Sequence, residues 1–166
     1  KARYFSQQAR EPVLHYEHKA IGYNYRLSNL LAALGRSQFT DLDRRIAIRK
    51  KHFQAYTESL NKLPGISFMP ISDEGLPNYW LSCLIMDDSQ TKVTRDALIN
   101  ICDQASIEVR PTWKPLHLQT VFQANQKFGG AISEGLFNRG LCLPSGSSLT
   151  DQERDKVISI LTSALS

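Results

Sequence analysis

The chain has 166 residues, of which 42% are apolar and 22% are charged, and its formal net charge is +4. This composition is that of a soluble globular domain large enough for one hydrophobic core. The mild positive charge suits anionic ligands but is not the dense basic stripe of a duplex-binding protein, and no apolar run approaches the roughly 20 residues that cross a bilayer. The first residue is Lys1 instead of a methionine, and the sequence does not open with a signal-peptide pattern. We expect the chain to be part of a longer protein.

The first 26 residues are predicted to form an arm. Residues 1–10 have the pattern of the middle of a helical segment, because no N-cap residue precedes them. Pro12 interrupts that helix, and residues 11–26 show neither a helical nor a strand period. The stretch 15–26 is dense in polar aromatic and hydrogen-bonding residues, a composition that favours a functional loop.

A long amphipathic helix is predicted next, capped by Ser28 or Asn29 and ended by Pro64-Gly65. Its apolar residues recur at steps of three and four. Because the span is long for a globular protein, we expect a bend or a break near Thr40-Asp41. Core packing and a subunit interface explain its apolar stripe equally well.

Residues 65–166 mix strands and helices, which indicates a small α+β layer domain. Strands are predicted at 65–69, 79–86, 107–110 (stopped by Pro111) and 141–143, and helices at 94–105, in two pieces over 118–140 and from 150 onward. Gly129-Gly130 separates the two pieces. Thr150 and Glu153 form a capping box for the last helix.

Common catalytic and metal-binding motifs do not account for the sequence: it has no GxSxG, Walker or HExxH motif. His15 and His18 have a metal-ligand spacing, but they lie in a predicted loop without a third ligand. The cysteines are odd in number, far apart and without CxxC spacing, which predicts neither a disulfide framework nor a zinc site and favours a reducing compartment. They are Cys83, Cys102 and Cys142.

Two segments have an unusual composition. Residues 22–29 place amides and Arg26 directly before a helix start, which suits an anion; a well-tied capping loop is the alternative. Residues 110–117 combine two prolines with Arg110, Trp113 and His117, which suits a phosphorylated or sugar ligand. A proline-rich connector with Trp113 in the core is the alternative there.

Together these segments resemble the DegT/DnrJ/EryC1/StrS aminotransferases, which act on nucleotide-linked sugars. The family has a GYNYR(L/M)(S/T)(N/D) loop before a small-residue helix, an E-x-RPxWxPxH segment and an RGLCLPSG stretch. The matching stretches here are residues 22–29, 108–117 and 139–146. The three motifs occur in the family's order, and the resemblance covers essentially the whole chain.

The resemblance implies the C-terminal small α+β domain of a fold-type I pyridoxal-phosphate transferase, preceded by an arm and a long helix. Residues 1–27 would be the arm from the large domain, 28–64 the connecting helix or helix pair, and 65–166 the small domain. The Schiff-base lysine would belong to the large domain, since no lysine here lies in the family's motif. Lys19 is interpreted as exposed, and Lys114 as a substrate-side residue. The isolated chain would therefore lack activity and would not retain pyridoxal 5'-phosphate.

The resemblance also implies a cytoplasmic homodimer with shared active sites. Asn24 would reach the cofactor phosphate of the partner subunit. Arg26, Trp113 and His117 would face the nucleotide sugar, and Arg110 would do the same or brace its loop. Glutamate would donate the amino group to a nucleotide-linked 4-keto-6-deoxy hexose, in surface glycan biosynthesis. The Trp-Lys-Pro variant at residues 113–115 most resembles members that act on UDP-linked 2-acetamido-4-keto sugars.

Two other functions are compatible with the residues. A non-enzymatic dimerisation or interaction module would use the long helix and need no cofactor. A nucleic-acid binder would use the cationic cluster, although a solvated helix face explains this cluster more simply. The cluster consists of Arg44, Arg45, Arg49, Lys50 and Lys51.

Overall fold

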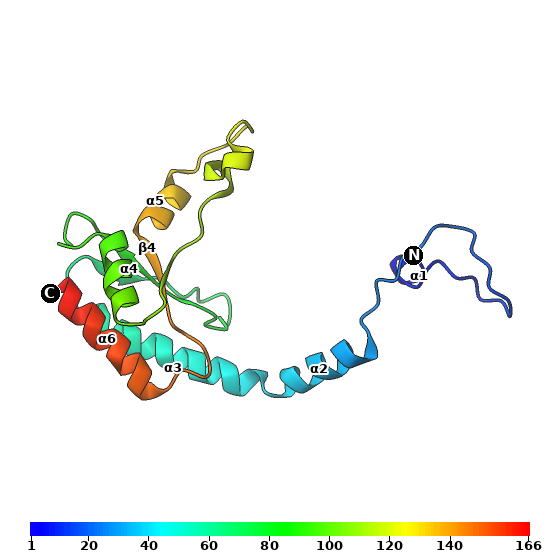
Figure 1. The fold of residues 1–166 in the computed structure, drawn as a ribbon, viewed down its shortest axis with the longest axis horizontal. Helices are drawn as coiled ribbons and strands as arrows, with labels where there is room; N and C mark the ends of the chain where they lie inside the picture. The colour runs from blue at the N-terminus through cyan, green and yellow to red at the C-terminus, as the bar shows by residue number, and fades with distance from the viewer. The chain divides into compact units, whose positions relative to one another are not determined.

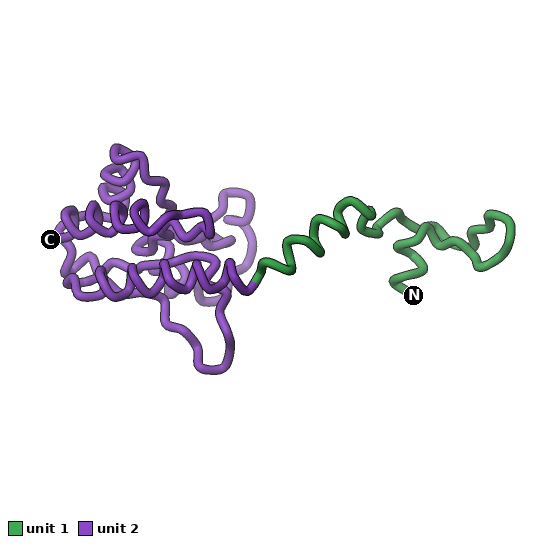
Figure 2. Tube along the Cα trace, turned by 90° about the horizontal axis from the view of Figure 1, so that it is seen from below, with its two compact units in different colours: residues 1–42 green, residues 43–166 purple.

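The computed structural model describes all 166 residues and consists of two compact units, residues 1–42 and 43–166 (Figure 2). The division into 1–27, 28–64 and 65–166 stays a prediction. No helix is both long enough and apolar enough to cross a membrane.

The arm contains one short helix, α1 (Ala2–Phe5), so the helix expected over residues 1–10 is mostly wrong. Gln8 and Ala9 have positive φ angles of 67° and 51°, which no continuing helix allows. The loop predicted beyond residue 10 is confirmed, and two isolated bridges tie it back: Gln7 to Asn24 and Arg10 to His18. Gly22 lies so close to Ala9 that an added Cβ would be 2.2 Å from its nitrogen.

The long helix is broken where predicted, into α2 (Asn29–Thr40) and α3 (Leu42–Leu60). Ser28 caps α2, because its hydroxyl accepts a hydrogen bond of 3.3 Å from the Leu31 amide. No residue of α2 is buried within this chain. In contrast, α3 buries one face, which carries His52, Phe53, Tyr56 and Leu60.

The second unit contains a four-stranded sheet in which every neighbouring pair is antiparallel and the order is β1-β2-β4-β3. The strands are β1 (Ile66–Phe68), β2 (Ser82–Met86), β3 (Arg110–Pro111) and β4 (Gly140–Leu143). Two strands begin later than predicted, since residues 79–81 lie before the start of β2 and residues 107–109 lie before the start of β3. Pro111 does not stop β3 but pairs with Leu141, which is possible because β3 is an edge strand.

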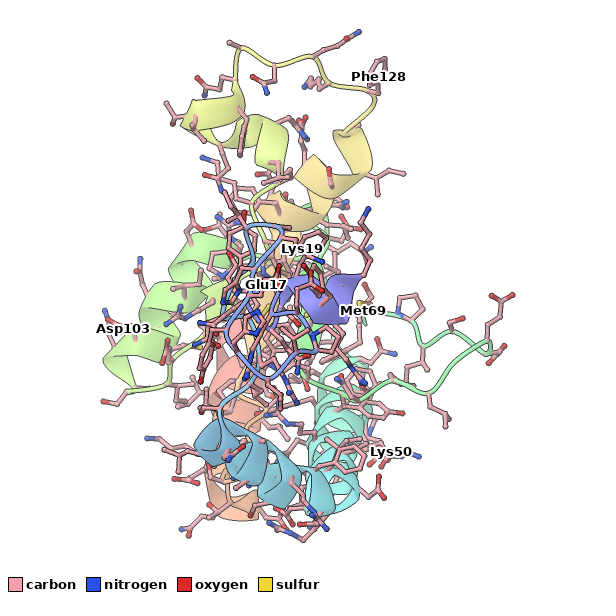
Figure 3. The ribbon with its side chains drawn as sticks, turned by 90° about the vertical axis from the view of Figure 1, so that its right-hand side faces the viewer. Glu17, Lys19, Lys50, Met69, Asp103 and Phe128 are labelled. Carbon is pink, nitrogen blue, oxygen red and sulfur yellow. The ribbon has the colours of Figure 1, made fainter.

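Three α-helices follow β2 along the chain: α4 (Arg95–Gln104), α5 (Ala131–Arg139) and α6 (Asp151–Leu165). The predicted capping box of α6 is confirmed. The helix expected from residue 118 is wrong, since only the 3-10 turns η1 (Leu116–Leu118) and η2 (Thr120–Phe122) occur there. The break at Gly129-Gly130 is confirmed. Exposed Phe128 lies beside it, at the far end of this segment in Figure 3.

One hydrophobic core joins the sheet to α3, α4 and α6, which supply a helical layer on one face (Figure 1). Its fully buried side chains include Tyr56, Leu60, Leu84, Met86, Leu98, Leu141 and Leu161. Because side chains alternate along a strand, Cys83 and Cys142 lie on the opposite face of the sheet from Leu84 and Leu141. The predicted α+β architecture is confirmed, and the non-core face of the sheet remains available for a site.

Candidate functional site

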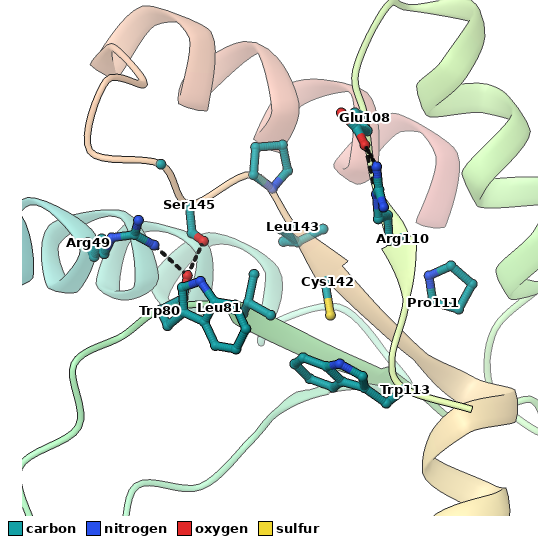
Figure 4. Close-up of a pocket in the computed structure, with 12 residues that line it drawn as sticks. Arg49, Trp80, Leu81, Glu108, Arg110, Pro111, Trp113, Cys142, Leu143 and Ser145 are labelled. Carbon is teal, nitrogen blue, oxygen red and sulfur yellow. Dashed lines mark hydrogen bonds and ion pairs between the residues drawn. The ribbon is translucent and has the colours of Figure 1, made fainter. Parts of the chain in front are cut away.

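A cavity of about 570 Å³ lies at the sheet of the second unit and is called the sheet cavity below (Figure 4). It brings together two of the predicted substrate residues, Arg110 and Trp113. The residues that line it include Arg49, Trp80, Glu108, Arg110, Trp113, Cys142 and Ser145. Aromatic faces and guanidinium groups thus share one hollow, which suits a ligand with both flat and anionic parts.

Trp80 and Trp113 form the aromatic part of the sheet cavity. Their ring centroids are 6.0 Å apart and their planes are tilted by 44°. Both side chains are more than half exposed, at 59% and 63%. Trp113 is therefore not the core residue of the connector alternative, because its indole borders a hollow instead of the hydrophobic core.

The backbone of Trp80 is fixed from several sides. Its carbonyl accepts hydrogen bonds from Arg49 Nη1 at 2.6 Å and from Ser145 Oγ at 2.8 Å. Its amide donates to Asn78 Oδ1 at 3.0 Å. Tyr79, the preceding residue, has a φ of +51°, a backbone conformation that residues other than glycine seldom adopt. The structure thus holds Trp80 in place outside the strand.

Sequence reasoning missed both Trp80 and Arg49. It included Trp80 in a strand because the run 79–86 is aromatic and branched. The preceding Pro77-Asn78 pair is a turn signal that could have separated Trp80 from the strand. Arg49 had no local signal, since it reaches Trp80 only after α3 packs beside the sheet.

Arg110 is held by Glu108 at the rim of the sheet cavity. Its Nε donates to Glu108 Oε1 at 2.7 Å, and its Nη2 donates to the same oxygen. Both side chains are exposed, at 78% and 73%. Since the carboxylate neutralises much of the local charge, Arg110 is better placed for directed hydrogen bonding than for long-range attraction of anions.

His117 lies in η1 and borders a different cavity, of about 330 Å³. Its Nε2 is 2.8 Å from Glu134 Oε1, and Lys127 Nζ is 3.3 Å from the same oxygen. These hydrogen bonds, with that from His117 the larger cause, lower the pKa of the Glu134 carboxyl. The carboxylate is therefore an acceptor, so that Nε2 carries the hydrogen and Nδ1 is the nitrogen left to meet a ligand.

Two residues around His117 were not predicted from the sequence. Glu134 lies on α5, and only the fold brings it to His117. Gly130 has a φ of +116°, and an added Cβ there would lie 2.9 Å from His117 Cε1. The Gly129-Gly130 pair is a predicted helix break, and Gly130 also leaves room for the His117 imidazole.

The arm carries the other two predicted residues, Asn24 and Arg26, at a cavity of about 790 Å³ that Arg3 and Arg10 also line. Arg10 lies over the ring of Tyr16, with its Cζ 4.3 Å from the ring centroid. Three guanidinium groups and an amide provide many N–H donors and positive potential. A phosphate group fits this set of donors, and no acidic residue but Glu11 lines the cavity.

The histidines and lysines of the arm give no sign of other chemistry. His18 Nδ1 is 2.9 Å from the carbonyl oxygen of Gln8, and His15 lies 3.4 Å from Glu17. No group of three or more potential ligands is arranged for a metal ion. Lys19 is exposed, as predicted, and so is Lys114 in the second unit.

Comparison with known proteins decides the family. The profile of the DegT/DnrJ/EryC1/StrS aminotransferase family matches residues 1–162. The chain belongs to this family. It is therefore related to enzymes that carry out sugar aminotransfer with pyridoxal phosphate, and the structure is their small-domain fold.

Similarities to individual proteins are consistent with this family. EpsN of Bacillus subtilis, assigned by its name as a pyridoxal phosphate-dependent aminotransferase, is 42% identical over 165 residues, covering 97% of this chain and 42% of EpsN. GDP-perosamine synthase of Vibrio cholerae is 31% identical over 139 residues, covering 83% and 37%. The crystal structure of the aminotransferase TlmJ from Streptoalloteichus hindustanus superimposes with a TM-score of 0.83 at 22% identity, covering 99% and 43%. The chain thus spans less than half the length of these relatives.

Proposed function

We propose that the full-length protein transfers the amino group of glutamate to a nucleotide-linked 4-keto-6-deoxy hexose, with a UDP-linked 2-acetamido-4-keto sugar as the preferred acceptor. The product would enter surface glycan biosynthesis in the cytoplasm. Family membership supports amino transfer to a sugar. The observation that carries the choice of a nucleotide-linked acceptor is the sheet cavity, where Trp80 and Trp113 lie beside Arg110.

The sheet cavity matches the parts of such a substrate. An indole face stacks on a flat nucleobase or on the apolar face of a sugar ring, a type of contact worth about 1–3 kcal/mol per base. Arg110, whose orientation is fixed by Glu108, donates to a diphosphate oxygen. In this proposal Ser145 and Arg49 act indirectly, because their hydrogen bonds keep Trp80 in position.

His117 is proposed to bind the sugar. Because Glu134 accepts the Nε2 hydrogen, Nδ1 is free to form a hydrogen bond with a sugar hydroxyl, which can act as donor or acceptor. The residue contributes orientation, since a reacting carbon must be held within a narrow range of positions for efficient chemistry.

The arm is proposed to hold the cofactor phosphate. Asn24 donates hydrogen bonds to the phosphate oxygens, Arg26 in the same cavity faces the nucleotide sugar, and Arg3 and Arg10 add positive potential. Pyridoxal phosphate, when bound, acts as an electron sink for the carbon that exchanges its amino group. We place the Schiff-base lysine outside these 166 residues, and we propose that the protein is a homodimer in which Asn24 completes the partner's site.

Amino transfer by the full-length protein tests the proposal. The protein is mixed with glutamate and, in separate reactions, a UDP-linked 2-acetamido-4-keto-6-deoxy hexose and a GDP-linked 4-keto-6-deoxy hexose. The rate of 2-oxoglutarate formation is measured. Faster formation with the UDP-linked sugar is expected, and the 166 residues alone should give none. Lack of turnover with any nucleotide-linked keto sugar would refute the activity.

An interaction module is the second candidate, and the apolar residues of α2 favour it. Leu30, Leu31, Leu34 and Phe39 are all more than half exposed within this chain. If the protein only assembled subunits, Leu31→Asp and Leu34→Asp would dissociate it without any effect traceable to amino transfer. Loss of both assembly and turnover would instead fit an enzyme whose sites are shared between subunits.

A further inference from the structure

Two cysteines face each other on the side of the sheet opposite the hydrophobic core. Cys83 on β2 and Cys142 on β4 are register partners, and their sulfur atoms are 3.6 Å apart. Both are free thiols, exposed by only 7% and 8%. Amino transfer uses neither of them. The third cysteine, Cys102, is fully buried in α4, in the core on the other side of the sheet.

The backbone geometry brings the two thiols unusually close. The Met69 amide donates to the Cys83 carbonyl, so the polar groups of Cys83 point toward β1 and away from β4. The Thr112 amide donates to the Gly140 carbonyl, so the backbone N–H and C=O groups of Gly140 point toward β3. The backbone groups of Cys142, two residues further along β4, point in the same direction. The two cysteines therefore form a non-hydrogen-bonded pair, the kind with Cα atoms only about 4.5 Å apart. That separation lies within the range of about 4.4–6.8 Å found across disulfides.

We propose that Cys83 and Cys142 are a redox-active dithiol that a peroxide oxidises to an intramolecular disulfide in the wall of the sheet cavity, and that a small thiol reduces this disulfide again by thiol–disulfide exchange. Cys142 borders this cavity, where its sulfur points toward the side of Trp113 (Figure 4). Cys142 is also the register partner of Arg110 across β3 and β4. A small oxidant thus has a route to the pair, and the new bond would form beside two proposed substrate residues.

The two sulfurs have different roles in the reaction. Either thiol can donate the hydrogen bond between the two sulfurs, and this pairing lowers the pKa of Cys83 and raises the pKa of Cys142. The Cys83 thiolate attacks one oxygen of hydrogen peroxide, the O–O bond breaks, and hydroxide leaves and takes up the proton that Cys83 released. The Cys142 sulfur then attacks the sulfenic acid at Cys83, the S–O bond breaks, and the Cys142 proton leaves with the hydroxyl group as water. Two thiols and one peroxide give one disulfide and two water molecules, with two electrons passed to the peroxide.

Peptide mapping of the full-length protein tests this inference without relying on its enzymatic activity. The protein is reduced with dithiothreitol, desalted, exposed to hydrogen peroxide, alkylated with iodoacetamide and digested with trypsin without reductant. Trypsin separates the three cysteines into peptides 63–92, 96–127 and 140–154. We expect 63–92 linked to 140–154, two hydrogens lighter than the sum of the two peptides, and released by dithiothreitol.

Variants and wild-type outcomes separate this dithiol from general oxidation. Cys102→Ala should give the same crosslink as wild type, and Cys83→Ser should give none. If Cys83→Ser fails to fold, the wild-type map still decides. Alkylation of both Cys83 and Cys142 after peroxide treatment would overturn the proposal, and so would separate sulfinic or sulfonic acids or a crosslink through Cys102. Because no substrate is used, this failure is distinct from a failure of the proposed amino transfer.

Discussion

His117 Nε2 lies 2.8 Å from Glu134 Oε1, beside Gly130, whose lack of a side chain leaves room for the imidazole. The pairing sets which imidazole nitrogen carries the hydrogen and which can meet a ligand. We therefore expect Glu134→Ala in the full-length protein to raise the KM for the sugar nucleotide severalfold, with a smaller change in the KM for glutamate. Steady-state kinetics with each substrate varied in turn measure this.

Lys127→Ala is the matched control for Glu134, because it removes the other partner of the carboxylate but leaves the imidazole contact. It should change the KM for the sugar nucleotide less than Glu134→Ala does. Equal effects of the two substitutions would show that the charge of this cluster matters and the orientation of His117 does not.

Asn24 should affect cofactor retention more than sugar binding. A hydrogen bond to a charged group contributes about 1.5–3 kcal/mol, so Asn24→Ala should weaken binding of pyridoxal phosphate roughly ten- to a hundredfold. The absorbance of bound cofactor after dialysis of the full-length protein measures this. Asn61→Ala, at an exposed asparagine of the second unit, is the control. A larger effect of Asn24→Ala on the KM for the sugar nucleotide would show that the loop is wrongly assigned.

His52 should make the second unit sensitive to mild acid. It is 99% buried, and no side chain forms a hydrogen bond with either ring nitrogen. Burial lowers its pKa, and nearby Arg154 adds to this effect, against the opposing charge of Asp151. Because the unfolded chain binds the proton more readily, stability is complete above the ordinary histidine pKa of about 6.5 and is lost as the pH falls through and below it.

Hydrogen exchange of the α3 amides measures this loss, after correction for the intrinsic exchange rate at each pH. Protection should fall between about pH 7.5 and pH 5.5, around the ordinary histidine pKa, and His52→Leu should remove most of this slope. The carboxyl of Asp151 has its pKa lowered by Lys51, so its own contribution is lost only at lower pH. The same slope in His52→Leu as in wild type would rule out His52 as the cause.

The features predicted correctly from the sequence depend on near neighbours in the chain. Ser28 caps α2 and Thr150 pairs with Glu153 within three residues, so local pattern is sufficient. The errors arise where tertiary contacts determine the local structure. For example, β3 forms only because it pairs with β4. Glu134 follows its partner His117 by 17 residues. The motifs identified the family and two residues of the sheet cavity, but Trp80 depends on a positive φ at Tyr79 that no motif encodes.

Substitution of Trp113 in the full-length protein is the sharpest test of the proposed substrate, because we propose that stacking in the sheet cavity selects a nucleotide-linked sugar. Trp113→Ala should lower kcat/KM for the sugar nucleotide roughly five- to a hundredfold, since stacking contributes about 1–3 kcal/mol. Trp113→Phe should retain most of that value, as should Ile132→Ala, an exposed apolar control outside the sheet cavity. Release of 2-oxoglutarate from glutamate in a single turnover should not change. An unchanged kcat/KM for the sugar nucleotide in Trp113→Ala, or an equal loss in the glutamate reaction, would show that Trp113 does not select the sugar nucleotide.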